Sequence, residues 1–191
     1  MAETTQSFRA KLRNLRCTVL IAAACTALNP AAGAPAARGA TDIAIATGAV
    51  SGLPLPRFVS LKADRVNVRA GPNKDQDVRW VYTRAGMPVE ITAEFENWRR
   101  IRDWEGAEGW VYHSLLSGKR TAVVVPKLNN ALVPLYESAD EKSTVVARLQ
   151  SGVLGVLKSC TGTWCEFSGK NFGGWIRQDR LWGAYPNEKV E

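Results

Sequence analysis

Beyond Phe58, short runs of β-branched and aromatic residues alternate with turns rich in glycine, proline and asparagine. No window of this region carries the long apolar stripe, repeating every 3.6 residues, that an amphipathic helix requires. Alternation of this kind is typical of short strands joined by tight turns. The pattern therefore predicts an all-β chain with five strands in each half of the region. They span residues 66–69, 79–82, 89–95, 98–102 and 109–112, then 132–136, 144–149, 153–159, 164–167 and 174–176.

The two halves repeat one unit. The stretch "RAGMPVEI" from residue 84 matches "LQSGVLGV" from residue 149, and "ENWRRI" from residue 96 matches "GTWCEF" from residue 162. A Gly-Trp phrase closes each half, as "EGWVYHSLL" from residue 108 and "GGWIRQDRL" from residue 173. The stretch "VNVRAGPN" from residue 66 matches "VPLYESAD" from residue 133, and along the chain the separation between matched points drifts only from 67 to 65 residues. This predicts a tandem repeat, with units at residues 58–122 and 123–187.

The N-terminal segment has the composition of an export signal. Basic residues between positions 9 and 16 precede the apolar run "CTVLIAAACTAL", and "NPAAGAPAARGA" offers cleavage sites after Ala34 or Ala36. The apolar run is shorter than the roughly 20 residues that span a bilayer. We expect residues 1–36 to be a signal peptide and the mature chain to have no stable membrane span. A retained anchor helix and lipidation at Cys25 are the alternatives. Residues 37–57, rich in small residues, predict a flexible linker.

The charge distribution argues against nucleic acid as a partner. The chain carries a net charge of +7, of which residues 1–42 supply five basic and two acidic side chains, or +3. The remaining +4 comes from 20 basic and 16 acidic side chains mixed along the chain. A nucleic-acid interface concentrates its basic residues on one face.

Cysteine usage is consistent with export. Cys17 and Cys25 lie in the predicted signal, so the mature chain keeps Cys160 and Cys165, in "SCTGTWC". An even pair in an exported chain predicts one disulfide, here across a hairpin. The alternatives are a metal site, for which the single His113 is distant in sequence, and a redox dithiol, which usually has closer spacing and an activating neighbour.

The first unit resembles the bacterial SH3-like domain, SH3b. The resemblance rests on "VNVRAGPN" from residue 66, a glycine turn, "NWRRI" and "GWVYHSLL". The second unit, with "CTGTWCEF" and "GGWIRQDRLWG", is similar to the cysteine-bearing copy of exported tandem-SH3 proteins, although "VPLYESA" departs from the usual first motif. The resemblance covers residues 61–185. It implies two small, five-stranded, partly open barrels, with short 3₁₀ turns at residues 113–115 and 178–180.

Strand parity assigns faces to the repeated tryptophans. Successive residues of a strand face opposite sides, so Ile101 and Phe167 are expected to point into the core, together with Cys165. Trp98 and Trp164 are then expected to point outward, partly exposed, as stacking platforms for a ligand. The alternative is that each tryptophan covers its neighbouring loop or the other domain.

In the eukaryotic SH3 fold, the equivalent tryptophan and the residues after Gly-aromatic-Ile line a peptide groove. By that resemblance, Trp98, Tyr112 and Leu115 would line a groove here, joined by Arg69 or Trp80. We further expect Arg100 or Arg102 to supply positive charge to an acidic ligand. The acidic loop of proline-peptide readers is missing from "RAGPNKDQDVR", which argues against that ligand. Taken together, the candidate binding residues are Trp98, Tyr112, Leu115, Arg69, Trp80 and Arg100, with Trp164 in the second copy.

The sequence carries no recognisable catalytic motif. No phosphate-binding glycine loop, His-Glu metal motif or nucleophile elbow occurs, and no cofactor is expected. We therefore expect a non-enzymatic protein, periplasmic or secreted, that binds peptidoglycan or an envelope protein. The alternative is a protein–protein adaptor or a regulator of a periplasmic enzyme.

Overall fold

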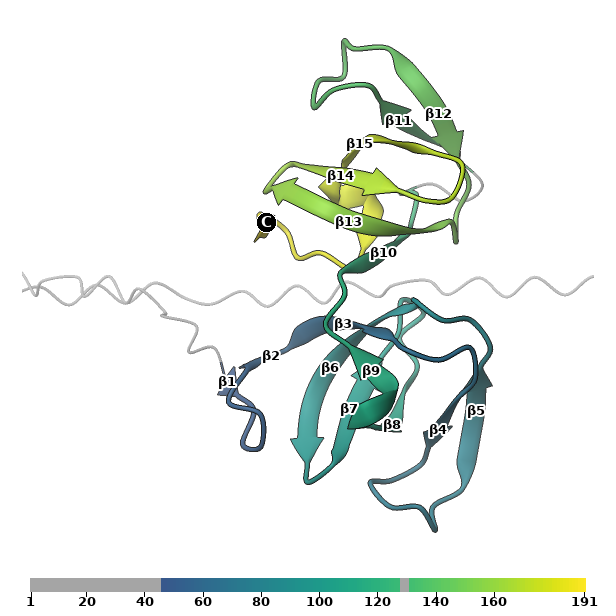
Figure 1. Ribbon diagram of the computed structural model, residues 1–191, viewed down its shortest axis with the longest axis vertical. Helices are drawn as coiled ribbons and strands as arrows, with labels where there is room; N and C mark the ends of the chain where they lie inside the picture. Colours follow the sequence, from purple (N-terminus) through teal and green to yellow (C-terminus); the bar gives the residue numbers. More distant parts are fainter. Residues whose placement is uncertain (1–45, 128–130) are drawn as a thin grey trace, which may run out of the picture. The chain divides into compact units, whose positions relative to one another are not determined.

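The computed structural model describes residues 46–127 and 131–191. The predicted signal peptide, with Cys17 and Cys25, and residues 37–45 of the predicted linker lie outside these ranges. The described part consists of strands and two short 3₁₀ turns, which confirms the all-β prediction (Figure 1). Neither 3₁₀ turn of this part of the chain has the length or hydrophobicity of a membrane-spanning helix.

The first copy is a seven-stranded sheet with the order β5-β4-β8-β7-β6-β3-β9, in which the pairs are antiparallel. The 3₁₀ turn η1 (His113–Leu115) joins β8 to β9. The strands are β3 (Arg57–Leu61), β4 (Val66–Arg69), β5 (Val78–Tyr82), β6 (Pro88–Phe95), β7 (Trp98–Arg102), β8 (Glu108–Tyr112) and β9 (Leu116–Ser117).

The second copy repeats this order strand for strand, as β12-β11-β15-β14-β13-β10-β16, with β17 also pairing with β13. The 3₁₀ turn η2 (Gln178–Arg180) occupies the place of η1. The tandem repeat is therefore confirmed. The strands are β10 (Thr121–Val124), β11 (Val133–Tyr136), β12 (Val145–Leu149), β13 (Leu154–Thr161), β14 (Trp164–Ser168), β15 (Gly173–Arg177), β16 (Leu181–Trp182) and β17 (Lys189–Val190).

In chain order, the first strand of each copy is β3 or β10, and neither is among the strands predicted from the sequence. In β10 all four residues are buried, so the strand lacks the alternation of apolar and polar positions that marks a half-exposed strand. β3 follows directly on a proline-containing stretch that has the composition of a linker. Both strands pair with the longest strand of their copy, β6 or β13.

The flexible linker predicted for residues 37–57 is wrong for residues 46–57. Strands β1 (Ala46–Thr47) and β2 (Pro54–Leu55) form a hairpin, and its turn binds the carboxylate of Glu94. The Ser51 amide donates to Glu94 Oε2 at 2.9 Å, and the Ser51 hydroxyl donates to Oε1 at 2.6 Å. Arg57 also donates to Oε1, at 2.8 Å. This stretch is therefore ordered by hydrogen bonds from its small polar residues to the buried Glu94 carboxylate.

Each copy has its own apolar core. In the first, Val66, Val68 and Ile101 are fully buried, together with Val111 of β8. In the second, Leu135, Phe167 and Ile176 are fully buried. Cys160 and Cys165 are cross-strand partners of β13 and β14 and form the predicted disulfide. The inward directions predicted for Ile101, Phe167 and Cys165 are correct.

Side chains of the two copies also touch each other. The ring of Phe58 on β3 packs against Trp182 and Tyr185, with centroid distances of 5.2 and 4.6 Å. The Tyr185 hydroxyl donates to Glu90 Oε1 at 2.8 Å, and Arg102 pairs with the other carboxylate oxygen. Burial and the Glu90 carboxylate raise the pKa of Tyr185. A cavity of about 520 Å³ lies beside these contacts.

Candidate functional site

Strand parity builds one wall of a groove from β4. Val66 and Val68 are buried in the first core, so the residues that alternate with them face the opposite side. These are Arg65, Asn67 and Arg69, of which Arg65 and Asn67 are exposed. The valines therefore anchor a strand that presents two guanidinium groups and one amide.

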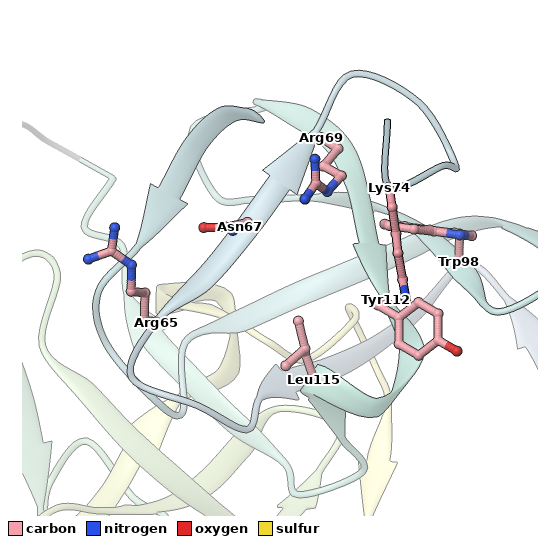
Figure 2. A pocket seen from close by; sticks show the side chains of 7 residues that line it. All are labelled: Arg65, Asn67, Arg69, Lys74, Trp98, Tyr112 and Leu115. Carbon is pink, nitrogen blue, oxygen red and sulfur yellow. The ribbon is translucent and has the colours of Figure 1, made fainter. Parts of the chain in front are cut away.

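This face of β4 forms one side of a hollow of about 340 Å³, which we call the first groove (Figure 2). Tyr112 ends β8, Leu115 lies in η1, and Lys74 comes from the loop between β4 and β5. Figure 2 shows the Lys74 side chain pointing toward Tyr112. The lining residues are Arg65, Asn67, Arg69, Lys74, Trp98, Tyr112 and Leu115.

Trp98 belongs to this groove, but the prediction that it is a partly exposed platform is wrong. Its side of β7 is the outward one, yet the residue is only 8% exposed. Tyr112, its cross-strand partner, packs edge to face against the indole, with centroids 5.4 Å apart and planes at 86°. Tyr112 therefore offers a ligand more surface than Trp98, which forms the floor.

The three cations of the first groove have no acidic partner in the described structure. None of the ion pairs among residues 46–127 and 131–191 includes Arg65, Arg69 or Lys74. Arg69 is oriented by one hydrogen bond, from its Nη1 to the Gln76 carbonyl oxygen at 2.7 Å. The groove therefore carries concentrated positive charge beside an aromatic pair.

Three of the predicted groove residues lie elsewhere. Arg100 pairs with Glu108 and lines a separate hollow beside Trp110. Trp80 packs against the first core and edge to face with Tyr82. Arg102, the alternative to Arg100, pairs with Glu90.

Three residues that line the first groove are absent from the groove predicted from the sequence, namely Arg65, Asn67 and Lys74. Arg65 and Asn67 alternate with Val66 and Val68, so parity applied to "RVNVR" predicts their shared face with Arg69. Lys74 had no such signal, because it lies in a loop.

The second copy has a hollow at the same place, of about 290 Å³, which we call the second groove. Its chemistry differs: Leu132 stands in the place of Arg65, Pro134 in that of Asn67, and Glu141 in that of Lys74. Arg177 pairs with Glu141 at 3.3 Å and contacts Asp179 at 3.9 Å, so its charge is matched within the copy. Residues lining this groove include Leu132, Pro134, Tyr136, Glu141, Arg177 and Arg180.

Trp98 and Trp164 occupy equivalent positions, and each has a tyrosine and an arginine nearby. The two copies supply this tyrosine and arginine from exchanged positions. Arg69 and Tyr112 of the first copy correspond to Tyr136 and Arg177 of the second, because Arg69 and Tyr136 pair with Trp110 and Trp175. Trp164 is 9% exposed. Tyr136 packs against it at 5.4 Å and 87°, and the Arg177 guanidinium lies 5.5 Å from its ring centroid. The predicted exposure of Trp164 is therefore also wrong.

The repeated Gly-Trp phrase has a packing explanation. A Cβ atom at Gly109 would lie 3.0 Å from the Arg69 carbonyl oxygen and would clash with Val68. A Cβ atom at Gly174 would lie 2.5 Å from the Tyr136 carbonyl oxygen, at the equivalent crossing. Glycine lets β8 and β15 approach β4 and β11 closely, which holds the two walls of each groove together.

The part of the chain that the structure describes contains no cluster of three or more His, Cys, Asp or Glu side chains suited to a metal ion. His113 lies exposed in η1, with its ring 5.1 Å from that of Tyr112.

The strand order, the 3₁₀ turn before the last strand and the aromatic groove define a tandem SH3-like protein. The family model for the bacterial SH3 domain matches residues 62–118 and 129–183, which is more than half of the chain. The protein belongs to the bacterial SH3 domain family.

Two solved structures share similarity with the chain. NlpC2 from Trichomonas vaginalis is 11% identical, with a TM-score of 0.30, over 66% of this chain and 48% of that one. NlpC1 from the same organism is 13% identical, with a TM-score of 0.31, over 71% of this chain and 48% of that one. The chain thus spans about half the length of these structures. No curated protein matches it.

Proposed function

We propose that the protein is an exported, non-enzymatic binding protein of the bacterial cell envelope and that its ligand is peptidoglycan. The observation that carries this proposal is the first groove, where the half-exposed Tyr112 packs on Trp98 and three cations share the lining. A ligand segment packs on the tyrosine ring and the aliphatic Leu115, while the polar side chains fix its orientation.

Three further observations support the proposal. Bacterial SH3 domains are modules that commonly bind cell-wall material, and this chain has two. The disulfide between Cys160 and Cys165 suits an oxidising compartment outside the cytoplasm. The N-terminal sequence has the basic and apolar parts of an export signal.

Cosedimentation of the purified protein with isolated peptidoglycan tests the proposal. We expect the wild-type protein to pellet with the polymer and Tyr112→Ala to be retained at least fivefold less. Trp175→Ala is the matched control, because Trp175 is a half-exposed aromatic residue that lines neither groove. Its retention should equal that of the wild type.

Two results would contradict the proposal. Absence of wild-type protein from the pellet excludes peptidoglycan, and crosslinking in cells to one dominant protein would then favour an adaptor. Turnover of a peptidoglycan fragment by the pure protein would contradict the non-enzymatic role.

A further inference from the structure

The seven residues of the first groove carry three positive charges, and no acidic residue is among them. The loop that supplies Lys74 also contains Asp75 and Asp77, but neither lines the groove. Of the charged residues in this loop, the basic Lys74 alone lines the groove, where it joins Arg65 and Arg69.

The fold itself does not require these cations. At the equivalent positions of the second copy, Leu132 replaces Arg65, Tyr136 replaces Arg69 and Glu141 replaces Lys74, and the same strands still form. Leu132 and Glu141 are exposed, as Arg65 and Lys74 are, so no packing need distinguishes these two pairs. Tyr136 differs, because it packs on Trp164.

We propose that the first groove recognises a carboxylate-bearing peptide segment, with Arg65, Arg69 and Lys74 binding the carboxylate groups. Guanidinium groups match the planar, two-oxygen geometry of a carboxylate and donate to both oxygens. The volume of about 340 Å³ suits a short peptide segment, and Tyr112 packs against its aliphatic part. This inference rests on the proposed function and names the part of the wall polymer that is bound.

The decisive comparison uses peptidoglycan whose free carboxyl groups have been converted to amides. This treatment removes the negative charges of the peptides and leaves the polymer otherwise intact. We expect the wild-type protein to bind native peptidoglycan at least tenfold more tightly than the amidated form. Equal binding to both would overturn carboxylate recognition and leave the proposed function standing.

Two charge-reversal variants locate the carboxylate site. Lys74→Glu introduces the residue that the second copy has at this position, and Lys119→Glu makes the same change at an exposed lysine outside the groove. Lys74→Glu should weaken binding to native peptidoglycan about tenfold and leave binding to the amidated form unchanged. Lys119→Glu should change neither by more than twofold. Equal losses in both variants would indicate attraction to net charge and overturn the site.

A soluble probe separates this inference from the proposed function. Acetyl-Ala-Glu-Ala with a free carboxyl terminus is titrated against the protein by amide NMR, with acetyl-Ala-Gln-Ala-amide as the neutral counterpart. Shifts in β4 and β8 with the acidic peptide alone support carboxylate recognition, even if peptidoglycan does not bind, and then a protein segment is its source. Identical responses to the two peptides would contradict it.

Discussion

Tyr112 packs edge to face on Trp98 with ring centroids 5.4 Å apart, and Tyr136 repeats this geometry on Trp164. The two tyrosines come from different strands, β8 in the first copy and β11 in the second. Both copies therefore share a tyrosine–tryptophan pair. In each copy the strand that does not supply the tyrosine supplies an arginine instead, Arg69 on β4 in the first copy and Arg177 on β15 in the second.

The burial of Trp98 predicts that its main contribution is to stability. Trp98→Ala should lower the free energy of unfolding by about 3–5 kcal/mol, because it leaves a cavity beneath Tyr112. Tyr112→Ala removes a half-exposed ring and should cost only about 1–2 kcal/mol. Urea denaturation monitored by fluorescence and circular dichroism compares them. Equal, small losses would contradict the role of Trp98 as the groove floor.

The close approach at Gly109 predicts a cost for even one methyl group. Gly109→Ala should lower the free energy of unfolding by about 1–3 kcal/mol, because the new Cβ atom meets Val68 and the Arg69 carbonyl oxygen. Gly118→Ala is the control, since a Cβ atom there meets nothing within 4 Å, and it should change stability by less than about 0.5 kcal/mol. If both variants unfold at the same urea concentration as the wild type, close strand approach does not explain the Gly-Trp phrase.

The hydrogen bonds to the Glu94 carboxylate predict that the β1–β2 hairpin becomes less ordered in acid. Burial raises its pKa, but the hydrogen bonds from Ser51 and Arg57 outweigh this and bring the pKa from 4.5 to about 2. Since the pKa is lower in the folded state, the stabilising effect is complete above pH 4.5 and is lost as the pH falls toward 2. The protection of the Ser51 amide against hydrogen exchange, relative to its intrinsic exchange rate at each pH, should therefore fall across this interval.

Two variants distinguish the acid sensitivity caused by Glu94 from that caused by other titrating groups. Glu94→Gln should lower the free energy of unfolding by about 1–3 kcal/mol at neutral pH and remove this pH dependence. Glu96→Gln, at an exposed position, should retain the pH dependence of the wild type. Persistence of the full acid response in Glu94→Gln would assign it to other groups.

The disulfide predicts a stabilisation confined to the second copy. Cys160 and Cys165 are five residues apart, and closing so short a loop contributes about 2 kcal/mol. Reduction should lower the stability of the second copy by that amount and leave ligand binding in the first groove unchanged, because residues 58–122 contain no cysteine. Urea denaturation with and without reductant measures this, and the double variant Cys160→Ser/Cys165→Ser should not respond to reductant. Weaker binding in the first groove after reduction would contradict it.

The elements were predictable where one face of a strand is buried and the other is not. In "VNVR", Val66 and Val68 alternate with polar residues, and β4 has the predicted bounds. The same signal is absent from "TAVV", where burial on both faces removes the contrast, and β10 was missed. Residues 46–55 were missed for another reason: their order depends on Glu94, some 40 positions further along the chain.

The repeat, the core face of the predicted strands and the cysteine pair follow from local alternation and spacing, so they can be read from the sequence. Which side chains meet in the groove depends on the packing of distant segments. The fold covers Trp98 with Tyr112, turns Arg100 to Glu108, and brings Lys74 from a loop to the groove that Arg69 lines. Parity gives the face of a strand, whereas burial and charge pairing depend on the neighbouring strands and loops that cover that face.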